Sequence, residues 1–226
     1  MNIQGKSVRT RLAPDQRRAQ LLCCAISAFA EHGVARATHA HVAERAGVSV
    51  SAVHSYFRTR DDLVAATLGE VEAYFLEIVS SFSAKKVPMR EALSMLVARF
   101  DQAAQDDSDV IKVWLDWSTG FRGDVWPRYL SMQDRVLEQV QRILTRGKRH
   151  GQLCKQINTK AAARLYVGGG HTIVLARFAG AARREIDILI DHLVRGVTCT
   201  GAEISIPCPN KGPGKACNRC DPRSDA

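Results

Sequence analysis

Apolar residues recur every three or four positions along almost the whole chain, which is the spacing of one face of an α-helix. The alternation of apolar and polar residues that marks a strand is not sustained anywhere, and no Asn-Gly or Asp-Gly hairpin turn occurs. Pro14 favours the start of a helix that ends before Gly33. Thr38 and Ser49 are placed to cap two short helices, the first of which ends at Gly47.

Six longer helices are expected after these three. The first two begin at Arg60 and Pro88, and the acidic run 106–109 favours the N-terminus of the third. The other three cover roughly 122–150, 159–180 and 183–199. The total is about nine helices and no sheet, so the expected fold class is all-α. After Ile206 the composition changes to Pro, Gly and charged residues, and a disordered tail is expected there.

The segment 38–57, THAHVAERAGVSVSAVHSYF, carries two helices too short to be stable alone. Val42 and Val53 are expected to face inward, and Tyr56 and Phe57 are expected on the second helix. This pattern predicts a helix–turn–helix, whose second helix presents its N-terminal residues to base edges in the major groove of DNA. The alternative is an ordinary helical corner with no ligand.

Charge favours the nucleic-acid interpretation. The formal net charge is +9, and residues 1–60 carry nine bases against three acids, while residues 61–206 are close to neutral. A basic head on a near-neutral body indicates a polyanion as the partner of the head, with a solvated basic face as the alternative. No apolar run is long enough to cross a membrane and no secretory signal is evident, so a cytoplasmic protein with no membrane partner is expected.

Double-stranded DNA is therefore the expected partner. Thr38, Tyr56 and Arg60 are expected to bond phosphates, which sets the register of the protein on the duplex. Arg9 and Arg11 lie on an arm that suits a narrow minor groove, with a frayed basic terminus as the alternative. The full set expected to contact DNA is Arg9, Arg11, Thr38, His39, Ser49, Val50, Ser51, Ala52, His54, Ser55, Tyr56 and Arg60.

The pattern T38-x3-V42-A43-x2-A46-G47-V48-S49-x3-V53-x2-Y56-F57-x2-R60-x2-L63 resembles the TetR family of one-component bacterial regulators. The blocks RTRLAPDQRRAQLL (9–22), HVAERAGVSVSAVHSYFRTRDDLV (41–64) and the Trp-rich IKVWLDWSTGFRGDVWP (111–127) are similar to its quorum-sensing master-regulator branch of the LuxR/HapR/SmcR type, over most of residues 8–200. That branch usually has Phe where this chain has His54, and Asn where it has Ser55. The operator preference of the branch therefore does not carry over to this chain.

The resemblance implies an all-helical homodimer that regulates transcription. It implies a DNA-binding region over residues 1–60 and a ligand-binding and dimerisation region over 61–200, while the tail over 201–226 has no counterpart in the family. The last two helices have apolar faces that would pair with a second copy in a four-helix bundle. Such a dimer would separate its two reading helices by about 34–36 Å, or a multiple of that, and would bind a dyad-symmetric operator.

The body helices carry many apolar residues on their inward faces, and by themselves these predict no more than a core. The resemblance implies that some of them line a pocket for a small molecule, with Leu137 and Gly170 standing where the branch tends to have a polar residue and Cys. We therefore expect a more apolar and roomier cavity. The run 168–170, Gly-Gly-Gly, is attributed to that volume or to close helix approach. The expected lining is Phe75, Val79, Leu96, Phe100, Trp114, Trp117, Val136, Leu137, Val140, Gly170 and His171.

Seven cysteines in a chain without a secretory signal are not expected to form a disulfide framework. Cys23 and Cys24 are expected to be small core residues. The spacing C-x8-C-x8-C-x2-C of Cys199, Cys208, Cys217 and Cys220 leaves three alternatives open: a disordered tail, which we favour, a Zn²⁺ site or a redox switch.

Enzyme motifs are missing from the sequence: it has no nucleophile elbow, no Walker loop and no His-Glu-x-x-His helix. An enzyme and a bound cofactor are therefore not expected. The alternative to a regulator is a helical protein-interaction or metal- and redox-sensing protein that uses the C-terminal cysteines.

Overall fold

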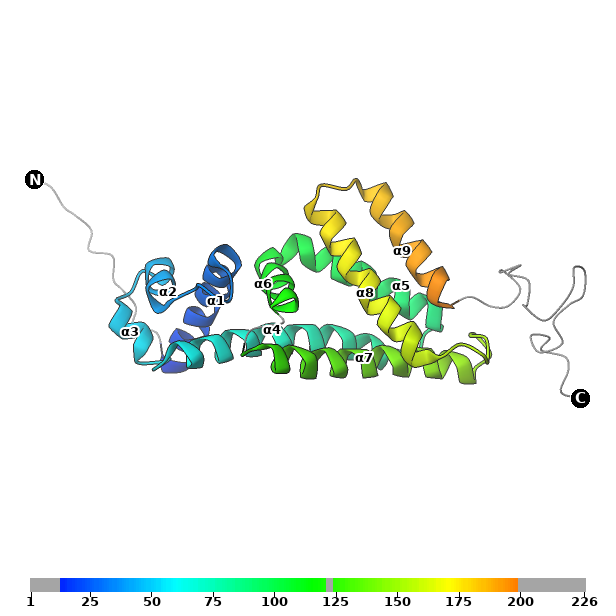
Figure 1. Ribbon diagram of the computed structural model, residues 1–226, viewed down its shortest axis with the longest axis horizontal. Helices are drawn as coiled ribbons and strands as arrows, with labels where there is room; N and C mark the ends of the chain where they lie inside the picture. Colours follow the sequence, from blue (N-terminus) through cyan, green and yellow to red (C-terminus); the bar gives the residue numbers. More distant parts are fainter. Residues whose placement is uncertain (1–12, 121–123, 199–226) are drawn as a thin grey trace, which may run out of the picture. The chain divides into compact units, whose positions relative to one another are not determined.

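A computed structural model describes residues 13–120 and 124–198. Within these residues the chain forms nine helices and no strand, which confirms the expected all-α fold (Figure 1). The helices are α1 Pro14–His32, α2 His39–Ala46, α3 Val50–His54, α4 Arg60–Ser83, α5 Met89–Asp106, α6 Ser108–Thr119, α7 Trp126–Arg149, α8 Thr159–Phe178 and α9 Arg183–Thr198.

The caps of the two short helices are those that the sequence predicts. The Thr38 side chain accepts a hydrogen bond from the backbone N–H of His41, and the Ser49 side chain accepts one from Ala52. Gly47 ends α2 with a left-handed backbone, φ 63° and ψ 37°, which glycine adopts without steric strain. These caps satisfy backbone groups that the first and last turns of a helix otherwise leave without a partner.

Two of the expected helix bounds are wrong. The third helix ends at His54, so Tyr56 and Phe57 lie beyond it; the hydroxyl of Ser55, the next residue, donates to the carbonyl oxygen of Ala52 at 2.7 Å. The seventh helix begins at Trp126 and not near residue 122, because Pro127 lies in its first turn, where a missing N–H has no cost.

The chain divides into two compact units. The first comprises Met1–Ala73 and Asp109–Asp124, and the second comprises Tyr74–Ser108 and Val125–Ala226. Helix α4 thus contributes to each unit, and α6 belongs with the N-terminal helices. The sequence-based boundary between residues 60 and 61 concerns DNA binding and stays a prediction.

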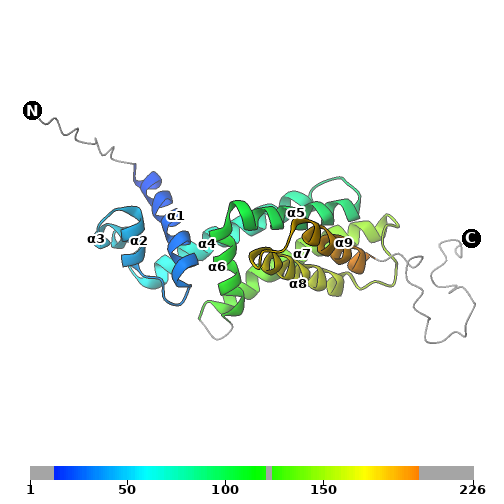
Figure 2. The ribbon, with the colours of Figure 1, turned by 90° about the horizontal axis from the view of Figure 1, so that it is seen from above.

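The second unit is built from α5, α7, α8 and α9 around one apolar core (Figure 2). The phenolic hydroxyl of Tyr166 donates to the carbonyl oxygen of Leu93 at 2.6 Å, which ties α8 to α5. Burial raises the pKa of this phenol far above its usual range, so it stays a neutral donor. Gly169 has no side chain to hold α8 away from α9, since a Cβ built there would lie 2.3 Å from a methyl carbon of Leu193.

Candidate nucleic-acid interface and ligand region

Helix α3 and the residues at its two ends bring five of the twelve expected DNA-contacting residues to the surface. Ser49, Ser51, His54 and Ser55 are exposed, and Val50 keeps 43% of its surface accessible. Ser49 caps the helix and its hydroxyl lies 3.0 Å from that of Ser51. Short side chains allow the backbone of α3 to come close to DNA, and hydroxyl groups both donate and accept hydrogen bonds there.

The apolar side of α3 rests on a closely packed support within the same unit. Val42 of α2 and Val53 of α3 are fully buried, as the sequence predicts, and Phe57 follows with 2% exposure. The guanidinium of Arg18, on α1, lies 5.5 Å from the centre of the Phe57 ring. A helix of five residues is not stable alone, so this packing holds α3 in place.

His39 has a different position from the one expected. Only 7% of its surface is exposed, and its Nε2 lies 2.7 Å from the carbonyl oxygen of Phe57. Its ring stacks on that of His54, with ring centres 3.9 Å apart. The expected DNA contact of His39 is therefore corrected: this side chain supports α3 from behind.

The loop between α1 and α2 is held from two sides. Arg60, expected to bond phosphate, donates from Nη2 to the carbonyl oxygen of Val34 at 2.6 Å and from Nε to that of Ala37 at 3.1 Å. A carboxylate oxygen of Asp116 accepts the N–H of Val34 at 2.7 Å. Asp116 lies on α6, which places this helix in direct contact with the loop that leads into the helix–turn–helix.

The sequence does not predict the hydrogen bond between Val34 and Asp116, because no local pattern links two residues so far apart in the chain. The Trp-rich block around Asp116 carries a family resemblance, but it gives no sign of a contact with Val34. Thr38 and Tyr56 are half-buried, so each keeps part of its surface accessible, and their expected phosphate contacts stay a prediction. The Thr38 side chain also caps α2.

Arg9 and Arg11 lie outside the described residues, as do Cys199, Cys208, Cys217, Cys220 and the tail expected to be disordered.

The residues expected to line a ligand pocket are divided between the two units. Trp114 and Trp117 belong to the first unit and are buried, with 4% and 1% exposure. In the second unit, Phe75 packs against Phe100 with ring centres 5.0 Å apart. Five further residues lie in the core of that unit: Val79, Leu96, Val136, Leu137 and Val140.

Close helix approach, one of the two expected explanations of the glycine run on α8, is confirmed at Gly169, and pocket volume stays a prediction. Gly169 permits the close approach to Leu193 described above, whereas a Cβ built on Gly168 or Gly170 meets no heavy atom within 4 Å. Next to Gly170, the Nδ1 atom of His171 lies 3.2 Å from the carbonyl oxygen of Val167. Burial lowers the pKa of His171, which favours its neutral form.

Leu137 also lines a polar hollow of about 500 Å³ between α7 and α8. The other side chains around this hollow are Asp134, Glu138, Gln141, Lys160, Ala163 and Arg164. It differs from the more apolar cavity that the sequence suggests, because two acids and two bases surround it. The apolar pocket itself stays a prediction.

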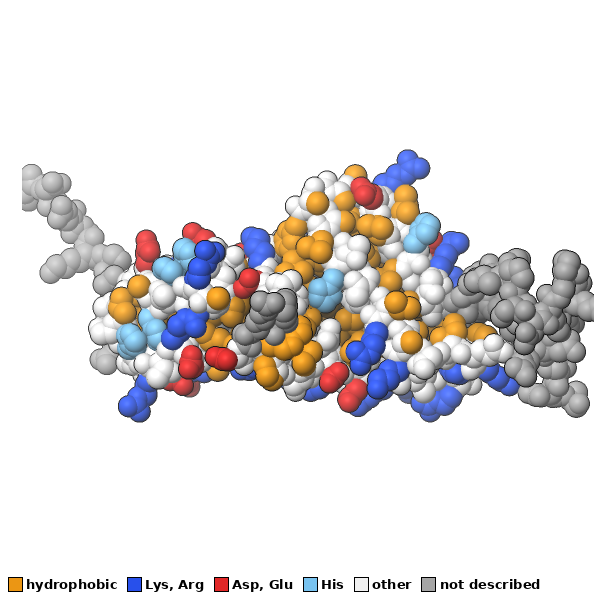
Figure 3. Space-filling model, viewed as in Figure 1, with side chains coloured by type: hydrophobic (Ala, Val, Ile, Leu, Met, Phe, Trp, Pro, Cys, Tyr) orange, Lys and Arg blue, Asp and Glu red, His pale blue; other side chains and the backbone are white. Residues whose placement is uncertain are grey.

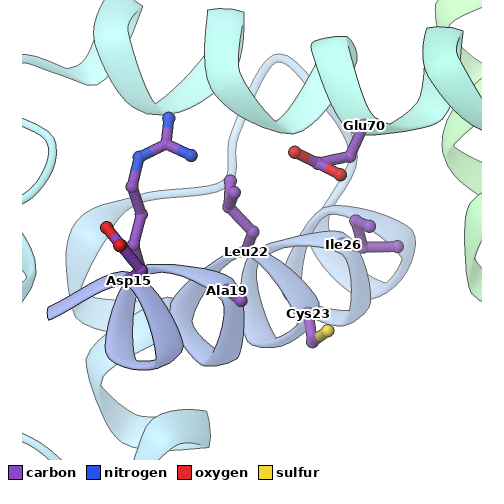
Figure 4. A pocket seen from close by; sticks show the side chains of 7 residues that line it. Asp15, Ala19, Leu22, Cys23, Ile26 and Glu70 are labelled. Atoms are coloured by element: carbon purple, nitrogen blue, oxygen red, sulfur yellow. The ribbon is translucent and has the colours of Figure 1, made fainter. Parts of the chain in front are cut away.

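A smaller hollow of about 260 Å³ lies in the first unit between α1 and Glu70 of α4 (Figure 4). Cys23 lines it and is exposed, and Cys24 is half-buried, so the expectation that both are core residues is wrong for Cys23. The apolar stripe of α1 passes through Leu22 and Ala25, and the two cysteines lie at its edge. Burial raises the pKa of the Cys24 thiol, which disfavours its reactive thiolate form.

In the described ranges, no three His, Cys, Asp or Glu side chains are grouped in a way that would hold a metal ion. None of the described helices is long and apolar enough to cross a membrane.

Comparisons with known proteins agree with this arrangement. The family model described as "Bacterial regulatory proteins, tetR family" matches residues 21–67, which include α2 and α3. The HTH-type transcriptional regulator LuxR of Vibrio harveyi is 31% identical over 194 residues, covering 86% of this chain and 93% of that protein.

Solved structures share the fold. The transcriptional regulator FadR from Bacillus subtilis, in complex with stearoyl-CoA, has a TM-score of 0.67 at 18% identity and covers 80% of this chain and 97% of its own. The SmeT–triclosan complex has a TM-score of 0.67 at 20% identity and covers 88% of this chain and 100% of its own. SmeT is described as the repressor of a multidrug efflux pump of Stenotrophomonas maltophilia. At these identities the likeness concerns the fold alone.

Proposed function

The chain belongs to the TetR family of bacterial transcriptional regulators, and from this premise we propose that it binds dyad-symmetric operators as a homodimer under the control of a small molecule. It is a regulator and not an enzyme. The observation that carries the proposal is the exposed surface of α3, where short polar side chains stand on a buried apolar support. A two-fold dimer presents two such surfaces, and an operator with matching symmetry follows.

Exposed apolar side chains support pairing through α8 and α9. Leu165, Leu175 and Phe178 on α8 keep 68%, 55% and 39% of their surface accessible, and Ile188 on α9 keeps 49%. Leu165, Gly168, Thr172 and Leu175 follow one another at intervals of three and four residues, which is the spacing of a helix–helix seam. Hydrophobic side chains are visible over these helices on the face shown in Figure 3. A second copy of this chain is the occupant that this surface fits.

Charging this surface is expected to separate the dimer. In the double variant Leu165→Glu, Leu175→Glu, the two copies bring four carboxylates into one apolar interface, which burial and repulsion disfavour strongly. Light scattering after size exclusion should report a dimer for the parent chain and a monomer for the variant. Leu130→Glu, at a leucine on α7 that keeps 42% of its surface accessible, should leave the dimer intact. A parent chain that is monomeric, or a double variant that stays dimeric, would contradict pairing through α8 and α9.

An apolar ligand is the third part of the proposal. The second unit has an apolar core, and pockets for small molecules are lined mainly by apolar side chains. FadR and SmeT, whose fold is similar, bind stearoyl-CoA and triclosan. The resemblance to the quorum-sensing branch of the family, together with the 31% identity to LuxR, supports a role in a quorum-sensing circuit.

DNA binding is tested with promoter duplexes at increasing salt. Binding through phosphates releases counterions, so affinity should fall by about tenfold or more between roughly 50 and 200 mM salt. Ser51→Glu places a carboxylate on the exposed surface of α3 and should weaken binding by at least about tenfold, since one lost base contact is worth about 1–3 kcal/mol. Ser131→Glu, at an exposed serine on α7, serves as the matched control. Absence of binding at low salt would favour the rival function, a protein-interaction or metal- and redox-sensing role.

A further inference from the structure

Four of the seven histidines form two stacked pairs in the first unit. His32 of α1 stacks on His41 of α2, with ring centres 3.9 Å apart and ring planes inclined by 27°. His39 of α2 stacks on His54 of α3 at the same distance, with planes inclined by 11°. Only the second pair includes a residue of the exposed α3 surface. The pair of His39 and His54 therefore connects the proposed DNA-reading surface with a buried histidine, His39.

Backbone carbonyls determine which nitrogen of each ring in the second pair carries hydrogen. Nε2 of His39 lies 2.7 Å from the carbonyl oxygen of Phe57, and Nδ1 of His54 lies 3.2 Å from that of Arg58. A carbonyl oxygen only accepts, so these two nitrogens are the donors. The second nitrogen of His54, Nε2, has no protein partner among the described residues, and the side chain is exposed.

We propose that His54 is a specificity-determining residue that contacts DNA through Nε2 and couples operator binding to its own protonation. This inference rests on the proposed function. A neutral Nε2 accepts a hydrogen bond, whereas a protonated Nε2 donates one. The surface of duplex DNA is dominated by acceptors, namely phosphate oxygens, guanine N7 and O6 and thymine O4. The complex therefore favours the imidazolium, and each His54 takes up one proton from solvent when it forms this contact.

The two rings of this pair differ in burial, since His54 is exposed and His39 is not. His39 is buried, where a charge is costly, and its ring holds that of His54 in place by stacking. Asp62, in the first turn of α4, has its pKa lowered mainly by hydrogen bonds from Thr59 and to a lesser extent by Arg58 and His39. Arg58 opposes the charge on His54, and the phosphates of bound DNA offset that repulsion.

The direction of the pH dependence follows from linkage. Because the complex holds more protons than the free protein and DNA, the extra affinity is fully present at low pH. It is lost as the pH rises and the bound imidazolium gives up its proton. Histidine changes charge between about pH 5 and 8, so the effect falls in an accessible window. The logarithm of the association constant should fall by up to about one per pH unit for each protomer bound.

The test uses the full chain and an operator duplex selected from random DNA at about pH 6 and again at about pH 8. Fluorescence anisotropy should show binding at least about tenfold tighter at the lower pH, beyond what the controls show. His54→Phe keeps a stacking ring and removes both nitrogens, so it should lose this increment and match the parent chain at the higher pH. The two selections should also differ at the base pairs that His54 contacts.

Two matched variants separate His54 from the other histidines. His32→Phe alters the other stacked pair of the same unit, and His192→Phe alters an exposed histidine whose Nδ1 lies 2.8 Å from its own helix carbonyl. Both should keep the pH dependence of the parent chain. Equal pH dependence in the parent and in His54→Phe, or its loss in His32→Phe, would overturn the role of His54 while leaving operator binding intact. Absence of binding at every pH would overturn the proposed function together with this inference.

Discussion

Replacing Arg177 by Met is expected to lower the free energy of unfolding by about 3–5 kcal/mol. Nε and Nη2 of Arg177, on α8, donate to the two carboxylate oxygens of Asp101, on α5, at 2.7 and 2.8 Å. Only 2% of the Asp101 side chain and 16% of the Arg177 side chain are exposed. The substitution leaves a buried carboxylate without its cation, and that loss, more than the loss of the pair itself, causes the destabilisation. Urea unfolding at a fixed protomer concentration measures the effect.

Two further variants test this explanation. Asp101→Asn combined with Arg177→Met removes both charges and should recover a large part of the lost stability. Arg195→Met breaks the exposed pair with Asp191 on α9, whose side chains are 62% and 51% exposed, and should cost less than about 1 kcal/mol. An Arg177→Met protein as stable as the Arg195→Met protein would show that the buried pair does not hold α5 against α8.

Replacing Gly147 by Ala is expected to destabilise the second unit by about 1–3 kcal/mol. A Cβ at this position on α7 would lie 2.2 Å from the sulfur of Met89 and 2.7 Å from its Cβ and Cγ. Met89 is 2% exposed at the first turn of α5, so its side chain is enclosed by neighbouring atoms and cannot turn out into solvent without leaving the core. The overlap includes Met89 Cβ, and the helix ends must separate to relieve it.

Gly170→Ala is the control for this prediction. It lies inside α8, where a new Cβ meets no heavy atom within 4 Å. Alanine is the better helix former, so this variant should gain up to about 1 kcal/mol in the same unfolding measurement. The two substitutions add the same atom to a helical glycine, and opposite signs are expected from their surroundings alone. A Gly147→Ala protein that gains stability would show that α5 and α7 separate readily at this contact.

Local chemistry explains why so many helix ends were predicted. Proline at the first turn of α1, the hydroxyl groups of Thr38 and Ser49, and the left-handed Gly47 each act within a few residues of the helix end that they determine. The end of α3 was predicted too late because the apolar Tyr56 and Phe57 continue the spacing of a helix. Apolar spacing alone does not show where the backbone leaves the helix.

The ligand region shows the corresponding limit of periodicity. Helical spacing indicated that Trp117 and Leu96 are buried, and both are, with 1% and 2% exposure. It did not indicate that they belong to different compact units. Burial of one helical face is a property of a single segment, whereas the identity of its neighbours depends on how the segments pack.

The sequence by itself determined the all-α class, most helix ends, the exposed polar surface of α3 and the family of the chain, because each of these depends on residues close together along the chain. The tertiary structure alone decided that His39 lies behind His54, that Asp116 binds the N–H of Val34, and that Asp101 pairs with Arg177. These contacts join residues between 15 and 82 positions apart. No spacing rule within one helix reaches that far, so only the packing of one helix against another brings such groups together.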